Sequence, residues 1–423
     1  MSEKSTAPKK TVLQRLKHMG PAAIVSAALI GPGTITTSGM SGNNFGFALV
    51  WAVFFSVIAM VVTQRMTGKI GLTTGSGLAA AIRQVYRGKS VYWPLAILLI
   101  LSFFVSNCAY QASNLVGASA GLSVVFGQHR TLYCIIITIA ALSLVLSGNI
   151  KYISNILTVV VFAMVIMFLI TAIVVKPNVG EILAGMFIPS IPNGAQMTAI
   201  ALIGTTMTPY CLYLHSDTHA SEKRENPDID IDDALVDNTY ASVVNAIAMF
   251  CVSTSIMVVG NALALNGASI SAVTDLANGL QPLVGSAAQQ VFAIGIFCAG
   301  ISSAACAPLA ATYIISGILG WSTDLKDKRF RILTIFVFIV GCIFAIFGGA
   351  PTKIITSAQA IGGVALPISV ILVLLVSNDK KLLGERTNSK GLNILTGIVF
   401  IITLVMSYRT FSTTIPTIIS WFA

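Results

Sequence analysis

The sequence predicts an all-α integral membrane protein with about eleven transmembrane helices, on the evidence of its composition and its long apolar stretches. Of the 423 residues, 55% are hydrophobic and only 9% are charged, whereas roughly 25% of residues are charged in soluble domains. A helix needs about 20 predominantly apolar residues to cross the hydrocarbon core of a bilayer. Stretches of that kind recur from Pro21 almost to the C-terminus, so we expect most of the chain to lie in lipid.

The apolar stretches predict the positions of the individual helices, with boundaries good to about two to four residues. In chain order, the expected spans are residues 21–43, 45–66, 93–122, 131–148, 152–175, 194–215, 237–262, 286–318, 332–349, 353–377 and 391–408.

The distribution of lysine and arginine predicts the orientation, because basic residues beside a helix resist translocation. All 25 of them except Arg130, Lys176, Lys353 and Arg409 fall on one side of this topology. We therefore expect a multi-pass protein of the plasma membrane with a cytoplasmic N-terminus and an external C-terminus. Topology also accounts for most of the net charge of +10, so the expected partners are the lipid bilayer and a small-molecule substrate rather than nucleic acid. The oligomeric state is left open.

Two of the expected spans are interrupted in corresponding places. The first contains Gly31-Pro32-Gly33-Thr34, and the sixth contains the stretch from Thr205 to Tyr210. A broken helix at bilayer depth exposes backbone groups, and it persists only where protein, water or a ligand satisfies them. Corresponding breaks indicate a substrate site at the midplane of a transporter built from inverted repeats, although a pair of ordinary proline kinks is an alternative.

This interpretation divides the chain into four parts. We expect a basic tail at residues 1–20, a first repeat at 21–175, a second repeat at 194–377, and an eleventh helix with an outer C-terminal segment at 391–423.

Four stretches of the sequence resemble the natural-resistance-associated macrophage protein (NRAMP) metal transporters. They are Phe45–Trp51, Thr74–Ala79, Thr205–Ser216 (TTMTPYCLYLHS) and Ala299–Ser303. The resemblance covers helices 1 to 10. It implies a LeuT-type fold of five plus five helices in inverted repeat.

The residues that hold metal in that family are replaced here. Its helix 1 motif, Asp-Pro-Gly-Asn, is matched by Gly31-Pro32-Gly33-Thr34, and its helix 6 motif, Met-Pro-His, by Thr208-Pro209-Tyr210. A glutamine of helix 10 is matched by Ala365, and the two acids of helix 3 are matched by Gln111 and Asn114. None of the 15 acidic residues is expected inside a helix core, so metal held by the family's side chains and proton coupling of the family type are not expected.

A neutral amino acid or similar zwitterion is the substrate that these residues favour in our interpretation. The amides near Gly33 and Thr34 lie at the N-terminus of a half-helix, which attracts a carboxylate, and the carbonyls near Gly31 and Thr206 would accept an ammonium group. Polar selectivity is assigned to Thr34, Thr208, Tyr210, and Asn107 or Gln111. The alternative is a divalent cation, Mg²⁺ or Mn²⁺, that keeps much of its water.

The driving ion is left open, and no cofactor is expected. Ser302 and Ser303 lie where related folds form a sodium site with helix 1 carbonyls, so sodium is one candidate. His215 could carry a proton near neutral pH, or could form a hydrogen bond at the end of a helix. The loop from Ser216 to Asp237 is expected to be solvated. An enzyme is not expected, because no catalytic constellation lies in the spans.

Overall fold

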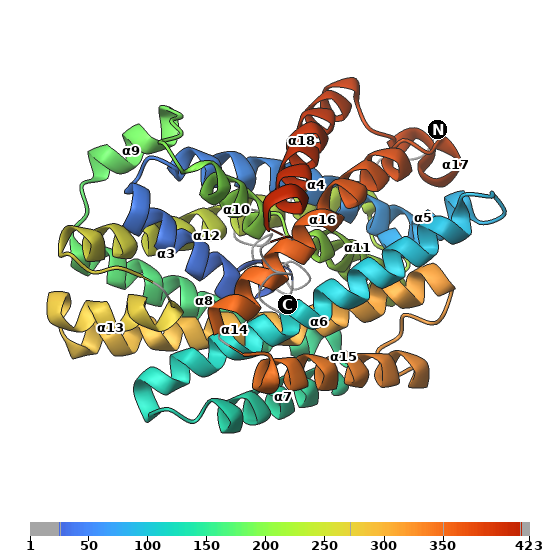
Figure 1. The fold of residues 1–423 in the computed structure, drawn as a ribbon. Helices are drawn as coiled ribbons and strands as arrows, with labels where there is room; N and C mark the ends of the chain where they lie inside the picture. Colours follow the sequence, from blue (N-terminus) through green and yellow to red (C-terminus); the bar gives the residue numbers. More distant parts are fainter. Residues whose placement is uncertain (1–24, 26, 271, 350, 415, 417–423) are drawn as a thin grey trace.

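The computed structural model describes residues 25, 27–270, 272–349, 351–414 and 416. This part of the chain is built of helices and contains no strand (Figure 1). Eight of its helices are long and apolar enough to cross a membrane, or nine if one bent pair counts as a span. The α-helices are Pro32–Phe45 (α3), Val50–Thr74 (α4), Leu78–Tyr86 (α5), Tyr92–Phe126 (α6), Arg130–Leu146 (α7), Ile150–Val175 (α8), Val179–Phe187 (α9), Gln196–Thr206 (α10), Pro209–Glu225 (α11), Ile231–Leu265 (α12), Val273–Val284 (α13), Ser286–Leu319 (α14), Lys328–Phe347 (α15), Pro351–Ser377 (α16), Lys380–Leu383 (α17) and Lys390–Arg409 (α18).

The predicted all-α membrane fold is confirmed, and the main correction concerns the stretch between the sixth and seventh spans. We expected a solvated loop from Ser216 to Asp237, but α11 continues to Glu225 and α12 already begins at Ile231. Asp230 caps α12, since its carboxylate accepts hydrogen bonds from the backbone amides of Asp232 at 3.0 Å and Asp233 at 3.3 Å. Capping of this kind satisfies the backbone amides of the first turn, so Asp230, Asp232 and Asp233 lie at the start of a helix and not in a loop.

Three short helices, α5, α9 and α13, connect longer ones and were not predicted. They have 9, 9 and 12 residues, which is too short to cross a bilayer. The predicted basic tail at residues 1–20 and the end of the predicted outer C-terminal segment, residues 417–423, lie outside the described residues.

Large apolar side chains point outward from the peripheral helices α7, α8, α15 and α18. Examples are Ile139, Phe162, Phe344 and Ile401, each more than half exposed. A surface this apolar is not stable in water, and it is the surface that a bilayer covers. Multi-pass membrane embedding follows from this observation together with the long apolar helices.

Helices of the two halves of the chain pack against one another. The most extensive packing is between α6 and α14, and α3 packs against α12 while α4 packs against α11; Figure 1 shows α3 beside α12. Glycines allow the α3–α12 approach, because a Cβ added at Gly42 would overlap the Met257 carbonyl, and one at Gly260 would overlap the Gly39 carbonyl. Small residues have this role in membrane helix packing.

Candidate functional site

The first helix break lies at Gly31, as predicted. Gly31 is extended (φ −121°, ψ 177°), and α3 begins at Pro32 with no side-chain hydrogen bond capping its N-terminus. The Ile35 amide donates to the Gly31 carbonyl at 3.2 Å. First-turn amides before that bond have no partner within the helix, so the amides of Gly33 and Thr34 are available to water or a ligand.

The second break lies at Met207 and Thr208. Helix α10 ends at Thr206, and α11 begins at Pro209 after an extended Thr208 (φ −65°, ψ 124°). The last carbonyls of α10 are therefore not followed by a further helical turn whose amides could donate to them, as predicted for this stretch.

Tyr210 joins the two breaks. Its hydroxyl donates to the Ala28 carbonyl, on the chain just before the first break, at 2.9 Å. The Tyr210 ring packs edge-on against Tyr110 of α6, with centroids 5.2 Å apart, and the side chain is buried. Tyr210 therefore fixes the first span to the start of α11.

The three predicted threonines are buried and donate to carbonyls. The Oγ1 atoms of Thr34, Thr206 and Thr208 donate to Leu29 at 3.4 Å, Leu202 at 2.8 Å and Thr205 at 3.1 Å. A hydroxyl has one proton and two lone pairs, so each Oγ1 that donates to a carbonyl presents only lone pairs to the space beside it. Such oxygens bind cations.

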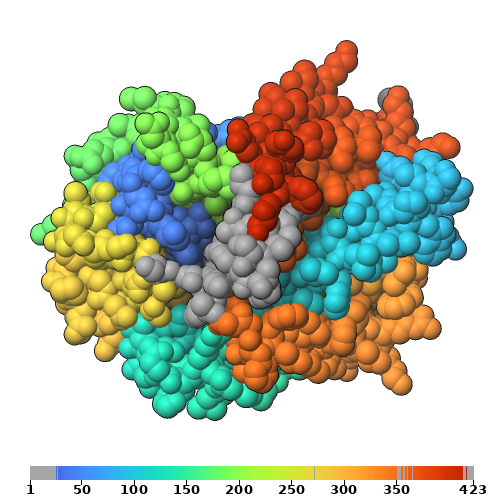
Figure 2. Space-filling view, in the orientation of Figure 1, coloured from blue at the N-terminus to red at the C-terminus, as the bar shows by residue number. Residues whose placement is uncertain are grey.

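Gln359 of α16 is the residue at the first break that the sequence analysis missed. A Cβ added at Gly33 would overlap its amide nitrogen. Gln359 also lines a cavity of about 330 Å³ together with Thr36, Thr205 and Gly204; Figure 2 shows α3 (blue), α10 (green) and α18 (red) gathered on this face of the molecule.

The family resemblance matches Ala365, which precedes Leu366-Pro367, to the helix 10 glutamine. Ala365 is buried in α16, six residues beyond Gln359. The missed signal was an amide side chain inside the stretch 353–377, which was expected to cross the membrane.

On α6, the structure places Asn114 at the first break instead of Asn107 or Gln111. A Cβ at Gly31 would lie 3.4 Å from the Asn114 Oδ1 atom, while the stem of Gln111 packs on Gly341 of α15. Asn107 donates to the Phe103 carbonyl at 2.8 Å. These residues share one face, but a rise of 1.5 Å per residue puts Asn107 about 10 Å from the level of Asn114.

Ser302 and Ser303 of α14 meet the first span just before its break. The Ser303 Oγ atom lies 2.9 Å from the Ala27 carbonyl oxygen and 3.1 Å from that of Ile30. The Ser302 Oγ atom lies 3.3 Å from the Ala27 oxygen and 3.1 Å from that of Ala299. The two hydroxyl groups have one proton each, so they can donate to only two of these four contacts at a time. Five oxygen atoms therefore lie close together: the two serine Oγ atoms and the three carbonyl oxygens.

The prediction that no acid lies in a helix core is wrong. Asp217 of α11 is only 1% exposed, and its Oδ2 atom has no hydrogen-bond partner. We placed Asp217 in a loop because we ended the sixth span ten residues too early. Within the described residues, no group of three or more His, Cys, Asp or Glu side chains could hold a metal ion.

Comparison with known proteins identifies the family. Residues 22–413 match the model of the natural resistance-associated macrophage protein-like family. The chain is 27% identical over 383 residues to the divalent metal cation transporter MntH of Caldanaerobacter subterraneus subsp. tengcongensis, covering 88% of this chain and 86% of that protein.

Solved structures support the LeuT-type fold. The manganese transporter of Eremococcus coleocola superposes with a TM-score of 0.77 at 18% identity, covering 96% of this chain and 89% of that one. MhsT in complex with L-phenylalanine gives 0.59 at 14% identity, covering 92% and 98%. At such identities the likeness shows the fold alone.

The prediction of amino acid transport is wrong. The family match over nearly the whole chain and the similarity to a divalent metal cation transporter overturn it. The carbonyls at the breaks could accept an ammonium group, but they could also accept hydrogen bonds from the water of a hydrated cation. This chain belongs to the natural resistance-associated macrophage protein-like family of transporters.

Proposed function

We propose that this protein carries a divalent metal cation, Mg²⁺ or Mn²⁺, across the membrane by alternating access at the two helix breaks. The similarity to a divalent metal cation transporter over 88% of the chain is the observation that carries the proposal. The breaks supply the site, because Tyr210 holds them together and Thr34, Thr208 and Gln359 lie at or beside them.

The donor set favours a hard cation that keeps part of its water. Thr34, Thr208 and the nearby carbonyls offer neutral oxygen atoms, and Gln359 adds its amide oxygen when its amide group turns that atom toward the break. Carbonyl and water ligands suit Mg²⁺, Ca²⁺ and Mn²⁺, whereas imidazole and sulfur suit later transition metals. Mg²⁺ in particular loses its waters reluctantly. Six waters at about 30 Å³ each fill roughly 180 Å³, so the 330 Å³ cavity at Gln359 can admit a hydrated ion.

We propose the orientation with a cytoplasmic N-terminus, which the distribution of lysine and arginine supports. The 226–230 connection between α11 and α12 then faces the cytoplasm. The repeat boundaries at 21–175 and 194–377 remain predictions.

Uptake by the purified protein in liposomes tests the proposal. We expect saturable uptake of Mn²⁺, competed by Mg²⁺, and no uptake of neutral amino acids. The Gln359→Ala variant is expected to raise the KM by about tenfold, because a hydrogen bond from the water of a hydrated cation to the amide oxygen is a bond to a charged group, and such bonds contribute on the order of 1.5–3 kcal/mol. Asn107→Ala is the matched control, since Asn107 lies about 10 Å from the level of the break.

Protein-dependent uptake of an amino acid, with none of either cation, would overturn the proposal. An Asn107→Ala variant that loses as much uptake as Gln359→Ala would contradict the assignment of Gln359 to the site.

We also propose that Na⁺ drives transport from the site at Ser302 and Ser303. The proposal is supported by the five neutral oxygen atoms at this site, because two hydroxyl protons cannot form hydrogen bonds across all four of their contacts. An inward Na⁺ gradient is expected to stimulate Mn²⁺ uptake, and Ser303→Ala is expected to abolish the stimulation. Ser369→Ala is the control, because the Ser369 hydroxyl donates at 2.9 Å to the Ala365 carbonyl of its own helix, α16, and not to a carbonyl of the first span. Uptake indifferent to Na⁺ would exclude this driving ion.

A further inference from the structure

A groove lies between α7 and α8 at the periphery of the helix bundle. It has a volume of about 350 Å³, and its mostly apolar lining includes Ala140 of α7, Val160 of α8 and Ile301 of α14. Ala140 is exposed, so the groove is open to the outside. Beside it, the exposed side chains of Ile139 and Phe162 belong to the surface that a bilayer covers. Lipid acyl chains are therefore the molecules that meet this groove.

One end of the groove lies at the turn that joins α7 to α8, where two lysines come together. Tyr152 lines the groove and directly follows Lys151, which is exposed. The exposed Lys326, from the connection between α14 and α15, packs on the same turn, because its Cγ atom would lie 3.2 Å from a Cβ added at Gly148. Gly148 precedes Lys151 by three residues, a separation of at most about 11 Å.

Arg331 of α15 holds the connection against the turn. Its Nε atom donates to the Leu325 carbonyl at 3.0 Å, and its Nη2 atom donates to the Leu146 carbonyl at 3.2 Å. These bonds tie the end of α7 to the segment that carries Lys326. A binding site whose backbone is already in place loses less conformational freedom when a ligand binds.

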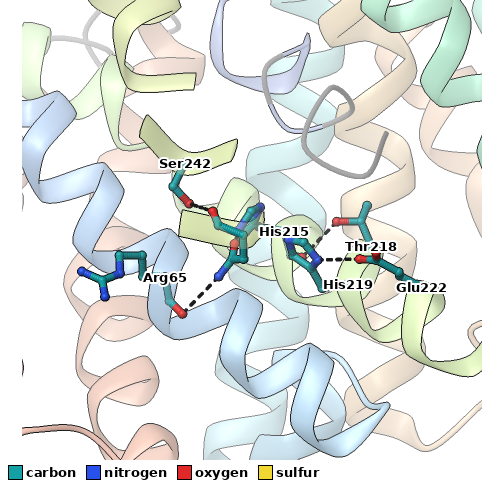
Figure 3. Close-up of polar contacts among 7 residues, drawn as sticks. Arg65, His215, Thr218, His219, Glu222 and Ser242 are labelled. Atoms are coloured by element: carbon teal, nitrogen blue, oxygen red, sulfur yellow. Dashed lines mark hydrogen bonds and ion pairs between the residues drawn. The ribbon is translucent and has the colours of Figure 1, made fainter. Parts of the chain in front are cut away.

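The ammonium groups of these two lysines are free, whereas other titratable groups at this end of the protein have partners. On α11, the His215 Nε2 atom lies 2.9 Å from the Asn238 Oδ1 atom. His219 pairs with Glu222 at 3.0 Å, as Figure 3 shows. Among the described residues, no hydrogen bond or ion pair engages the ammonium group of either lysine.

The acidic residues near the turn leave an excess of positive charge. Residues 147–151 and 321–331 contain five basic and two acidic side chains, a net charge of +3. Both acids are occupied with backbone amides, since Asp324 accepts from one at 2.8 Å and Asp327 caps the start of α15. Glu225 of α11 lines, together with the turn, a separate cavity of about 360 Å³. The end of the groove therefore attracts an anion.

We propose that an anionic phospholipid binds here, with one acyl chain in the groove and its phosphate at Lys151 and Lys326. Basic pockets between membrane helices on the cytoplasmic side bind anionic headgroups. The inference takes its orientation from the proposed function, which places the turn at the cytoplasmic leaflet. Tyr152 lies between the apolar groove and the lysines and is 53% exposed, and tyrosine is enriched at this level of the membrane.

Native mass spectrometry of the full-length protein in detergent measures the affinity for the first bound lipid. Dioleoylphosphatidylglycerol is the anionic probe. Dioleoylphosphatidylcholine, which has the same acyl chains and no net charge, is the reference. Each lysine near an anionic lipid contributes about fivefold in affinity, so we expect phosphatidylglycerol to bind about 30-fold more tightly than phosphatidylcholine.

Two variants test the two parts of the site separately. Lys151→Gln combined with Lys326→Gln is expected to remove the preference for phosphatidylglycerol and to leave the binding of phosphatidylcholine unchanged. Ala140→Phe is expected to weaken the binding of both lipids by about tenfold, because its ring occupies the groove and displacing two buried methylene groups has an effect of this size. Ala140 is exposed, so the larger side chain leaves the packing of the helices intact.

The controls make the same chemical changes elsewhere. Lys380→Gln combined with Lys381→Gln removes two exposed lysines from α17. Ile139→Phe adds a ring to α7 at an exposed residue that does not line the groove. Both control proteins are expected to bind the two lipids as the unaltered protein does.

Equal affinity for the two lipids in the unaltered protein overturns the proposal. So does a preference that survives the loss of Lys151 and Lys326 or disappears equally in the α17 control, and so does an Ala140→Phe protein that binds as tightly as Ile139→Phe. Because this measurement involves no transport, its failure leaves the cation proposal standing. Phosphatidylglycerol binding by a protein that takes up neither cation sinks only the cation proposal.

Discussion

Replacing Gly33 by alanine is expected to reduce cation uptake by about tenfold or more while leaving the protein folded. The added methyl group would overlap the amide of Gln359, and a flexible side chain can swing away at small cost to stability. The displaced amide then no longer faces the site, and losing one hydrogen bond to a charged group, here the hydrated cation, costs on the order of 1.5–3 kcal/mol. The measurement is the KM and maximal rate of Mn²⁺ uptake.

Gly204→Ala is the matched control, because it lies in the same cavity and its added Cβ would meet only the Met406 Cε atom at 3.6 Å. We expect near-normal uptake from it. A Gly33→Ala protein that transports as well as Gly204→Ala would remove Gln359 and Gly33 from the site.

Gly42→Ala is expected to lower thermal stability sharply, because its methyl group would overlap the backbone carbonyl of Met257 on α12. Backbone cannot rotate away as a side chain does, so α3 and α12 must separate. Overpacking of this kind typically costs about 1–3 kcal/mol. The measurement is the thermal unfolding midpoint of the detergent-solubilised protein.

Gly397→Ala provides the comparison for that loss. Gly397 lies within α18 with open space around its added Cβ, and alanine favours helix by up to about 1 kcal/mol over glycine. Its midpoint is expected to stay level or rise. Equal midpoints for the two variants would show that the α3–α12 glycine contact is unimportant.

The long helices could be predicted because lipid imposes a strong requirement on sequence. A span must be apolar over about 20 residues, so α6, α8 and α14 stand out. The end of α11 could not be predicted in this way. Its later turns carry Asp217, His219 and Glu222, so hydropathy falls, yet Asp217 and His219 are buried by packing against other helices. Hydropathy does not distinguish a polar residue that faces protein from one in a loop.

The breaks at Gly31 and Met207 were visible in the sequence, since glycine and proline interrupt helices at bilayer depth. Their partners were not. Gln359 and Asn114 come from α16 and α6, and only the packing of these helices shows which turn of each faces the break. The substrate class was misjudged for a related reason. The carbonyls of a broken helix accept an ammonium group or the water of a hydrated cation, and the comparisons with known proteins were needed to reject the amino acid.

The most direct test is to locate Mn²⁺ by anomalous scattering in crystals of the protein grown with the ion. We expect one main peak at the helix breaks, beside Thr34, Thr208 and Gln359, which is lost in Gly33→Ala. A peak absent from the breaks but present elsewhere in the membrane core would contradict the proposal that neutral oxygens at these breaks hold the transported cation.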